Sequence, residues 1–215
     1  MRFRHLTSAV AQILLNASSG PILRGNDFLL VGNSQQPSIL NLTEGTFEQF
    51  SNYQTQSFAA TSDKVAVIYY SSGYRVAVFD HSANELSNFS TGTQQSASIR
   101  MTDTKIFVSD SQDDTSGTDS GAIYVYDHDG SNKTKITFPG STNDYSGNAI
   151  DKLAVGSGKI AVGSDYYPNF SSKGKVDLMD EDGSNVITIY PALSNQSNFG
   201  STVNIHNDKL YISAS

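Results

Sequence analysis

The chain has 215 residues, of which 37% are hydrophobic, so it is long enough to bury the core of a single domain. Its 14 basic and 21 acidic residues give a net charge of −7, which argues against nucleic acid or anionic lipid as a partner. The absence of cysteine excludes disulfides, thiol catalysis and cysteine-ligated zinc, and no apolar stretch approaches the roughly 20 residues of a membrane span.

One unit of four short apolar segments, separated by turns, recurs along the chain. Counted from residues 27, 64, 105, 159 and 209, which open the second segments, the intervals are 37, 41, 54 and 50 residues. A four-stranded propeller blade has about 40 to 50 residues. A fifth unit begins at Phe199 with only its first two segments. The second and third segments lie at 28–32 and 38–42, at 64–68 and 74–80, at 105–109 and 121–127, and at 159–163 and 174–180, and the fifth unit has its second segment at 209–213.

The apolar pattern within these segments is that of β-strands. In the segment 122–126, aliphatic residues alternate with tyrosines, and a period of two is typical of a strand. The second segments are apolar almost throughout, as expected of inner strands that are covered on both faces. The sequence therefore predicts an all-β fold, a β-propeller of four-stranded antiparallel blades with four full repeats and a half-repeat, over residues 21–215. Residues 1–20 form a separate N-terminal segment.

Two motifs carry a resemblance to known repeats. The segment Phe199-Gly-Ser-Thr-Val, followed after a turn by Lys209-Leu-Tyr-Ile-Ser, resembles the FG-GAP repeat of integrin-type propellers, and the turns 127–132 and 180–185 resemble the Asp-x-Asp-Gly hairpins of TolB-type repeats. Together with the Ser- and Asn-rich background, these units are similar to repeat regions in structural proteins of tailed phages, particularly marine ones. The resemblance implies a role in the virion.

The acidic turns at Asp127 and Asp180 invite a test for calcium. An EF-hand needs a bidentate Glu at loop position 12, where this sequence has Phe138 and Pro191. The interpretation is instead that Asp caps each turn and that Gly130 and Gly183 supply a positive φ in the two hairpins.

A second acidic loop follows the second strand of the third unit. It offers four carboxylates, which are the ligands a hard cation prefers, although the Asp-x-Asp-x-Asp-Gly spacing of integrin-type loops is absent. A solvated loop is the preferred interpretation, so no cofactor is expected and calcium is the alternative. The carboxylates belong to Asp110, Asp113, Asp114 and Asp119.

Tyrosines gather near loops and strand ends, where amphipathic aromatic rings suit a binding surface. The alternative is that they pack over the edges of blades. Those predicted for a binding surface, with one neighbouring phenylalanine, are Tyr69, Tyr70, Tyr74, Tyr166, Tyr167 and Phe170. No nucleophile elbow, phosphate-binding loop or dinucleotide fingerprint is present, so the chain is not expected to be an enzyme.

The half-repeat raises the question of closure, because an incomplete blade exposes sheet edges. The preferred hypothesis is that a strand containing Val10, Ile13 and Leu14 pairs beside the strand that contains Leu210 and Ile212. Two alternatives stay open, namely an N-terminal helix that anchors the chain to a partner, and a longer protein that supplies further blades.

We therefore expect a non-enzymatic structural or interaction protein, located in the virion as a tail, fibre or capsid-attached component. Its expected partners are other virion proteins or symmetric copies of itself, and a glycan or receptor on the host surface. The alternatives are an exported bacterial propeller, extracellular or periplasmic, that binds glycan or protein with or without calcium, and a propeller hydrolase or lyase.

Overall fold

The computed structural model describes residues 23–24, 28–31, 38–41, 47–49, 55–138, 152–164, 173–192 and 198–214. The predicted N-terminal segment 1–20 lies outside these ranges. Every named element within them is a β-strand. No helix in the described part of the chain is long and apolar enough to cross a membrane.

The strands form four sheets of four strands and one sheet of two, each antiparallel and built from consecutive strands. The first blade contains β1 (Leu23–Arg24), β2 (Phe28–Val31), β3 (Ser38–Asn41) and β4 (Phe47–Gln49). The second contains β5 (Thr55–Ala60), β6 (Val65–Tyr70), β7 (Tyr74–Phe79) and β8 (Glu85–Ser90). The third contains β9 (Ser96–Met101), β10 (Lys105–Asp110), β11 (Ala122–Asp127) and β12 (Thr134–Thr137).

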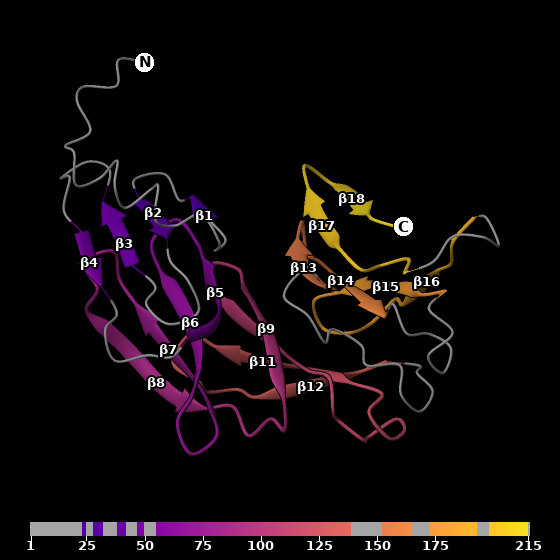
Figure 1. Ribbon diagram of the computed structural model, residues 1–215, viewed down its shortest axis with the longest axis horizontal. Helices are drawn as coiled ribbons and strands as arrows, with labels where there is room; N and C mark the ends of the chain where they lie inside the picture. The colour runs from indigo at the N-terminus through magenta and orange to yellow at the C-terminus, as the bar shows by residue number, and fades with distance from the viewer. Residues whose placement is uncertain are drawn as a thin grey trace, which may run out of the picture.

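The fourth blade contains β13 (Leu153–Gly156), β14 (Lys159–Ser164), β15 (Lys175–Asp180) and β16 (Ile187–Ile189), and the fifth sheet contains β17 (Val203–His206) and β18 (Lys209–Ile212). The first strands of successive blades contact one another, β5 with β9, β9 with β13 and β13 with β17, so the blades follow one another along an arc (Figure 1). The predicted propeller architecture, with four full repeats and a half-repeat, is confirmed.

The core lies between blades, and this explains the apolar second strands. Along β6, Val65 and Val67 belong to a cluster shared with the first blade, whereas Ala66 and Ile68 belong to one shared with the third. In β11, likewise, Ile123 packs toward the fourth blade and Tyr126 toward the second. Both faces of β6 and β11 are therefore covered, which is why a strand-length run such as 65–68 can be apolar throughout.

The Asp-x-Asp-Gly segments are hairpin turns, as their sequence predicts. In the third blade, Gly130 N donates to Asp127 O over 2.9 Å, and Asn132 Nδ2 donates to the Asp127 carboxylate over 2.6 Å. Lys105, which opens β10, pairs with the same carboxylate over 2.5 Å. Because Lys105 lies directly opposite Asp127 in the β10–β11 register, this ion pair links the start of the second strand to the end of the third. Lys159 and Asp180 repeat the arrangement in the fourth blade.

The Phe199-Gly200 pair, which carries the FG-GAP resemblance, lies where the fifth sheet meets the fourth blade. Phe199 forms a bridge to Gly174, and a Cβ placed on Gly174 would come within 2.8 Å of the carbonyl carbon of Phe199. The Phe199 ring joins the cluster that Val176 and Val203 form between these two sheets. Glycine at this position therefore permits a close approach of two backbones.

Candidate binding face

The topology places every second connection at the same end of the blades. Because neighbouring strands in each sheet are antiparallel, the connections between second and third strands lie on the same side as the connections to the next blade. These include 71–73, 91–95 and 111–121, and 111–121 is longer than the described connections at the other end, such as 102–104 and 128–133. We call residues 70–74, 91–95 and 110–121 the long-loop face.

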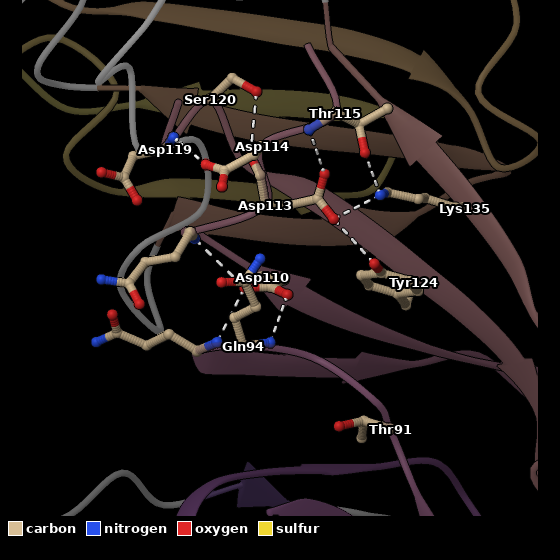
Figure 2. Close-up of polar contacts among 12 residues, drawn as sticks. Thr91, Gln94, Asp110, Asp113, Asp114, Thr115, Asp119, Ser120, Tyr124 and Lys135 are labelled. Atoms are coloured by element: carbon tan, nitrogen blue, oxygen red, sulfur yellow. Dashed lines mark hydrogen bonds and ion pairs between the residues drawn. The ribbon is translucent and has the colours of Figure 1, made fainter. Parts of the chain in front are cut away.

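The Asp110 side chain fastens two of these connections together. It is fully buried, and its carboxylate accepts hydrogen bonds from the backbone N–H groups of Gln94 (2.7 Å) and Gln95 (3.0 Å), as Figure 2 shows. Gln112 N donates to the same carboxylate over 3.3 Å. The β8–β9 connection is therefore held against the end of β10 by charge-assisted hydrogen bonds.

Asp113 is the second anchor of the 110–121 loop. Lys135 Nζ pairs with its carboxylate over 2.5 Å, the Tyr124 hydroxyl donates over 2.8 Å and Thr115 N donates over 3.0 Å (Figure 2). Burial by itself raises the pKa of Asp113, but the bonds from Lys135, Thr115 and Tyr124 outweigh burial and lower this pKa to about 2. The loop is thus tied to β11 and β12 by an ionised carboxylate.

The four aspartates considered as calcium ligands do not converge. Asp110 and Asp113 are engaged as described, and Asp114 Oδ1 accepts from the backbone N–H of Asp119 over 2.8 Å. The Asp119 carboxylate points away from Asp113 (Figure 2). Within the described ranges, no three His, Asp or Glu side chains come together to hold a metal ion. The geometry thus assigns the carboxylates of Asp110, Asp113 and Asp114 to shaping the loop.

Two lysines complete the cluster, Lys133 directly before β12 and Lys135 on it. Lys133 Nζ lies 4.4 Å from the centroid of the Tyr124 ring and donates to the carbonyl of Thr91 over 2.7 Å. The Tyr126 hydroxyl donates to the same carbonyl, also over 2.7 Å. Burial lowers the pKa of Lys133, and the nearby Lys135 lowers it further. Sequence reasoning missed both lysines, although the signal was available: Tyr124 and Tyr126 alternate on β11, and Lys133 and Lys135 alternate at the start of the next strand.

The structure places three of the six aromatic residues that were predicted for a binding surface. Tyr70 is 58% exposed, and its ring meets that of the half-buried Tyr74 at 5.3 Å and 77°, across a tight turn in which Ser72 and Gly73 have positive φ. Tyr69 points the other way and is only 7% exposed. Its hydroxyl donates to Asn88 Oδ1 over 2.9 Å, so it packs within the second blade. Tyr166, Tyr167 and Phe170 lie outside the described residues.

Of the residues predicted to close the propeller, only those near the C-terminus are described. Leu210 and Ile212 are partly buried and pack with Val203 and Ala161, which places them against the fourth blade. Val10, Ile13 and Leu14 lie outside the described residues. Closure by an N-terminal strand therefore stays a prediction.

The comparisons with known proteins agree with this architecture. No protein-family model and no curated protein matches the sequence. Solved structures do match: the β-propeller domain of the Trilobed protease from Pyrococcus furiosus superposes with a TM-score of 0.62 at 13% identity, over 91% of this chain and 64% of that one. The Dos1 propeller superposes with a TM-score of 0.57 at 15% identity, over 89% of this chain and 50% of that one. The N-terminal domain of Nup159 superposes with a TM-score of 0.52 at 15% identity, over 90% of this chain and 61% of that one.

These similarities define the class of the molecule. The chain is a β-propeller protein, built from four-stranded antiparallel blades. It spans less than two thirds of the length of each of these three solved chains. Because identities this low establish the fold alone, the activity of those proteins does not transfer to this chain.

Proposed function

We propose that the chain is a non-enzymatic interaction protein that binds its partner through the long-loop face. The observation that carries the proposal is the Tyr70–Tyr74 pair, which presents a 58% exposed ring beside a loop cluster that is fastened down by buried carboxylates. A surface that is ordered before binding loses less entropy when the partner docks. Aromatic rings supply most of the contact area in such surfaces at low entropic cost.

The interior polar groups of this face support a positioning role. Asp113, Lys135 and Tyr124 bond to one another, and Asp110 bonds to the backbone of the neighbouring connection. These groups hold the loops in place and already have partners within the chain. Contact with another molecule is therefore made by exposed residues, which include Tyr70, Gln94 and Gln95. Rings, hydroxyls and amides of this kind suit a neutral polar partner, either a protein surface or a glycan.

The setting we propose is the virion of a tailed phage, in a tail, fibre or capsid-attached component. The resemblance of the Phe199-Gly200 unit and of the Asp-x-Asp-Gly-Ser-Asn turns to phage structural repeats supports it. In a virion the long-loop face would contact other virion proteins or the host surface. An exported bacterial propeller with the same face is the competing interpretation, and the experiment below separates the two.

The test is mass spectrometry of virions purified from the culture that carries this gene, combined with hydroxyl-radical footprinting. The chain is expected in the particles at a fixed ratio to the capsid protein, with Tyr70 and Tyr74 less oxidised there than in the free protein. Absence from the particles overturns the virion setting. Presence with unchanged oxidation at Tyr70 overturns the assignment of the binding face.

A variant pair makes the second arm specific. Tyr70→Ala together with Tyr74→Ala is expected to lower incorporation into particles, or binding to host cells, at least tenfold. Tyr211→Ala is the control, because the Tyr211 ring on β18 is 53% exposed and that of Tyr70 is 58% exposed. It is expected to leave incorporation into particles and binding to host cells unchanged. Equal losses for the two variants would count against the long-loop face.

A further inference from the structure

The outer strand of the fourth blade presents an edge without a charged side chain. Val186, Ile187 and Tyr190 are 41%, 60% and 56% exposed on and beside β16. The outer strands of the second and third blades instead carry Glu85 and Lys135. Charged residues are a usual protection of an edge strand against pairing with another chain, because its unpaired N–H and C=O groups are a template for pairing. The β16 edge lacks that protection.

We propose that this edge is a homodimer interface, in which β16 pairs antiparallel with β16 of a second copy around a two-fold axis at Thr188. The segment 186–190 has the sequence Val-Ile-Thr-Ile-Tyr, which is nearly symmetric about its centre. In this register Thr188 lies opposite Thr188, Ile187 opposite Ile189, and Val186 opposite Tyr190. Aromatic–β-branched and Thr–Thr pairs are among the cross-strand pairs that stabilise sheets.

The faces of the two sheets also match in this register. Ile187 lies opposite Leu178, and Ile189 packs in the cluster shared with the fifth sheet. Thr188 is on the other face, where its hydroxyl donates to Asp177 over 2.6 Å. A two-fold axis perpendicular to the sheet keeps each face on its own side, so the isoleucines of both copies form one apolar strip. An isologous interface of this kind closes as a dimer.

Neighbouring registers are less favourable. An axis at Ile187 would place Asn185 opposite Ile189, which sets an amide against an apolar side chain. An axis at Ile189 would place Pro191 opposite Ile187, and proline has no N–H group for the ladder. The axis at Thr188 places Pro191 of one copy opposite Asn185 of the other, beyond the ends of the paired strands, and the segment 185–191 contains no charged residue.

The first test is sedimentation equilibrium of the purified chain over a wide concentration range. The unaltered protein is expected to form a reversible dimer, and Ile187→Lys, which buries a charge in the interface, is expected to raise its dissociation constant at least tenfold. Leu86→Lys is the matched control, because Leu86 is 52% exposed on the outer strand β8, and it should leave the dimer unchanged. A monomer at all concentrations, or a dimer that Ile187→Lys does not weaken, overturns the proposal.

The second test reads the register from disulfide formation, since the chain has no cysteine of its own. Paired residues place their Cβ atoms about 4.5–5.5 Å apart, so Thr188→Cys is expected to give a covalent dimer under mild oxidation. In Val186→Cys the two sulfurs would be separated by four residues along the strand, about 13 Å at 3.3 Å per residue, and no covalent dimer is expected. Cross-linking of Val186→Cys as fast as Thr188→Cys, or of neither variant, overturns this register.

Both tests use the isolated chain and are independent of the partner on the long-loop face. The Tyr70→Ala, Tyr74→Ala variant is expected to retain the dimer. Failure of the β16 interface and failure of the binding face are therefore distinguishable.

Discussion

Gly130 in the third blade lies directly against the ring of Phe89 in the second. A Cβ placed on Gly130 would come within 2.6 Å of Phe89 Cδ1, which is closer than real Cβ atoms approach a neighbour. The next blade repeats the contact, because a Cβ on Gly183 would come within 2.9 Å of Ile136 Cγ2. The Asp-x-Asp-Gly turns therefore do more than reverse the chain: each turn packs its glycine on the outer strand of the preceding blade.

The first prediction is that Gly130→Ala destabilises the protein by about 2–3 kcal/mol, the sum of a strained left-handed backbone and an overpacked contact. The φ of Gly130 is +84°, a region that an L-residue occupies at a cost. Urea unfolding, followed by tyrosine fluorescence or circular dichroism, measures the change in the free energy of unfolding.

Gly158→Ala is the control for the backbone term. Gly158 also has a positive φ, +70°, but nothing lies within 4 Å of a Cβ built on it. Its substitution is expected to cost only about 1–2 kcal/mol. If the two variants lose the same stability, the contact with Phe89 contributes nothing and the packing role of the turn is wrong.

The blades could be predicted from the sequence because their signals are local. The alternation in 122–126 and the apolar run in 64–68 depend only on which faces of a strand are covered. The Asp-x-Asp-Gly turns depend on neighbouring residues that bond one another. The contact between Gly130 and Phe89 is not local, since it joins two blades, and no pattern within either turn indicates it.

The site was harder to predict because its bonds cross between segments. The acidic neighbours of Asp110 in the sequence indicate a candidate cation ligand. Its partners in the structure are backbone N–H groups of Gln94 and Gln95, which no side-chain motif encodes. Tyr69 and Tyr70 are adjacent in sequence and point to opposite faces of β6. The buried one is Tyr69, whose hydroxyl donates to Asn88 on β8. To predict this bond from the sequence, one would need to know how β6, β7 and β8 are aligned.

The second prediction concerns the dependence of stability on pH at Asp113. Its pKa is lowered to about 2 in the folded protein from an ordinary value of 3.8. Because the folded pKa is below the unfolded one, this carboxylate stabilises the fold above about pH 4 and loses that contribution as the pH falls toward 2. Asp113→Asn is therefore expected to cost about 2 kcal/mol at pH 7.

Urea midpoints of the two proteins from pH 7 to pH 2 test this. The difference between wild type and Asp113→Asn should be constant down to about pH 4 and then shrink. Asp114→Asn, at an exposed position of the same loop, is the control and should change stability by less than about 0.5 kcal/mol. A difference between wild type and Asp113→Asn that persists unchanged at pH 2 would refute the assigned ionic role.

The third prediction concerns the clamp at Asp110. Removing the carboxylate in Asp110→Ala eliminates its hydrogen bonds from Gln94 N, Gln95 N and Gln112 N. Hydrogen bonds to a charged group contribute about 1.5–3 kcal/mol each. Amide hydrogen exchange at Gln94 and Gln95 is expected to accelerate at least tenfold. The free energy of global unfolding is expected to fall by less than the free energy of this local opening. Asp110→Asn, which keeps one acceptor oxygen, should give an intermediate rate. Unchanged exchange in Asp110→Ala would show that the connection is held by other contacts.

The fourth prediction concerns an ion pair within β15. Lys175 and Asp177 are 1% and 0% exposed and lie 3.1 Å apart, and Asp177 also accepts a hydrogen bond from Thr188. Removing the carboxylate breaks this buried ion pair and the hydrogen bond from Thr188, so Asp177→Ala is expected to destabilise the protein by about 3–5 kcal/mol. The double variant Lys175→Met, Asp177→Val is expected to recover most of this loss, since replacing both charges by apolar groups is often neutral.

The exposed pair of Lys105 and Asp127 provides the comparison for that experiment. Its side chains are 38% and 31% exposed, and surface pairs contribute about 0–1 kcal/mol. Asp127→Ala removes this ion pair and also the hydrogen bonds of the carboxylate with Asn132 and Ser131. The fall in its unfolding temperature should still be smaller than the fall for Asp177→Ala. If the Lys175→Met, Asp177→Val protein unfolds at the same temperature as Asp177→Ala, the loss of stability in Asp177→Ala arises from lost packing. The ion-pair explanation then fails.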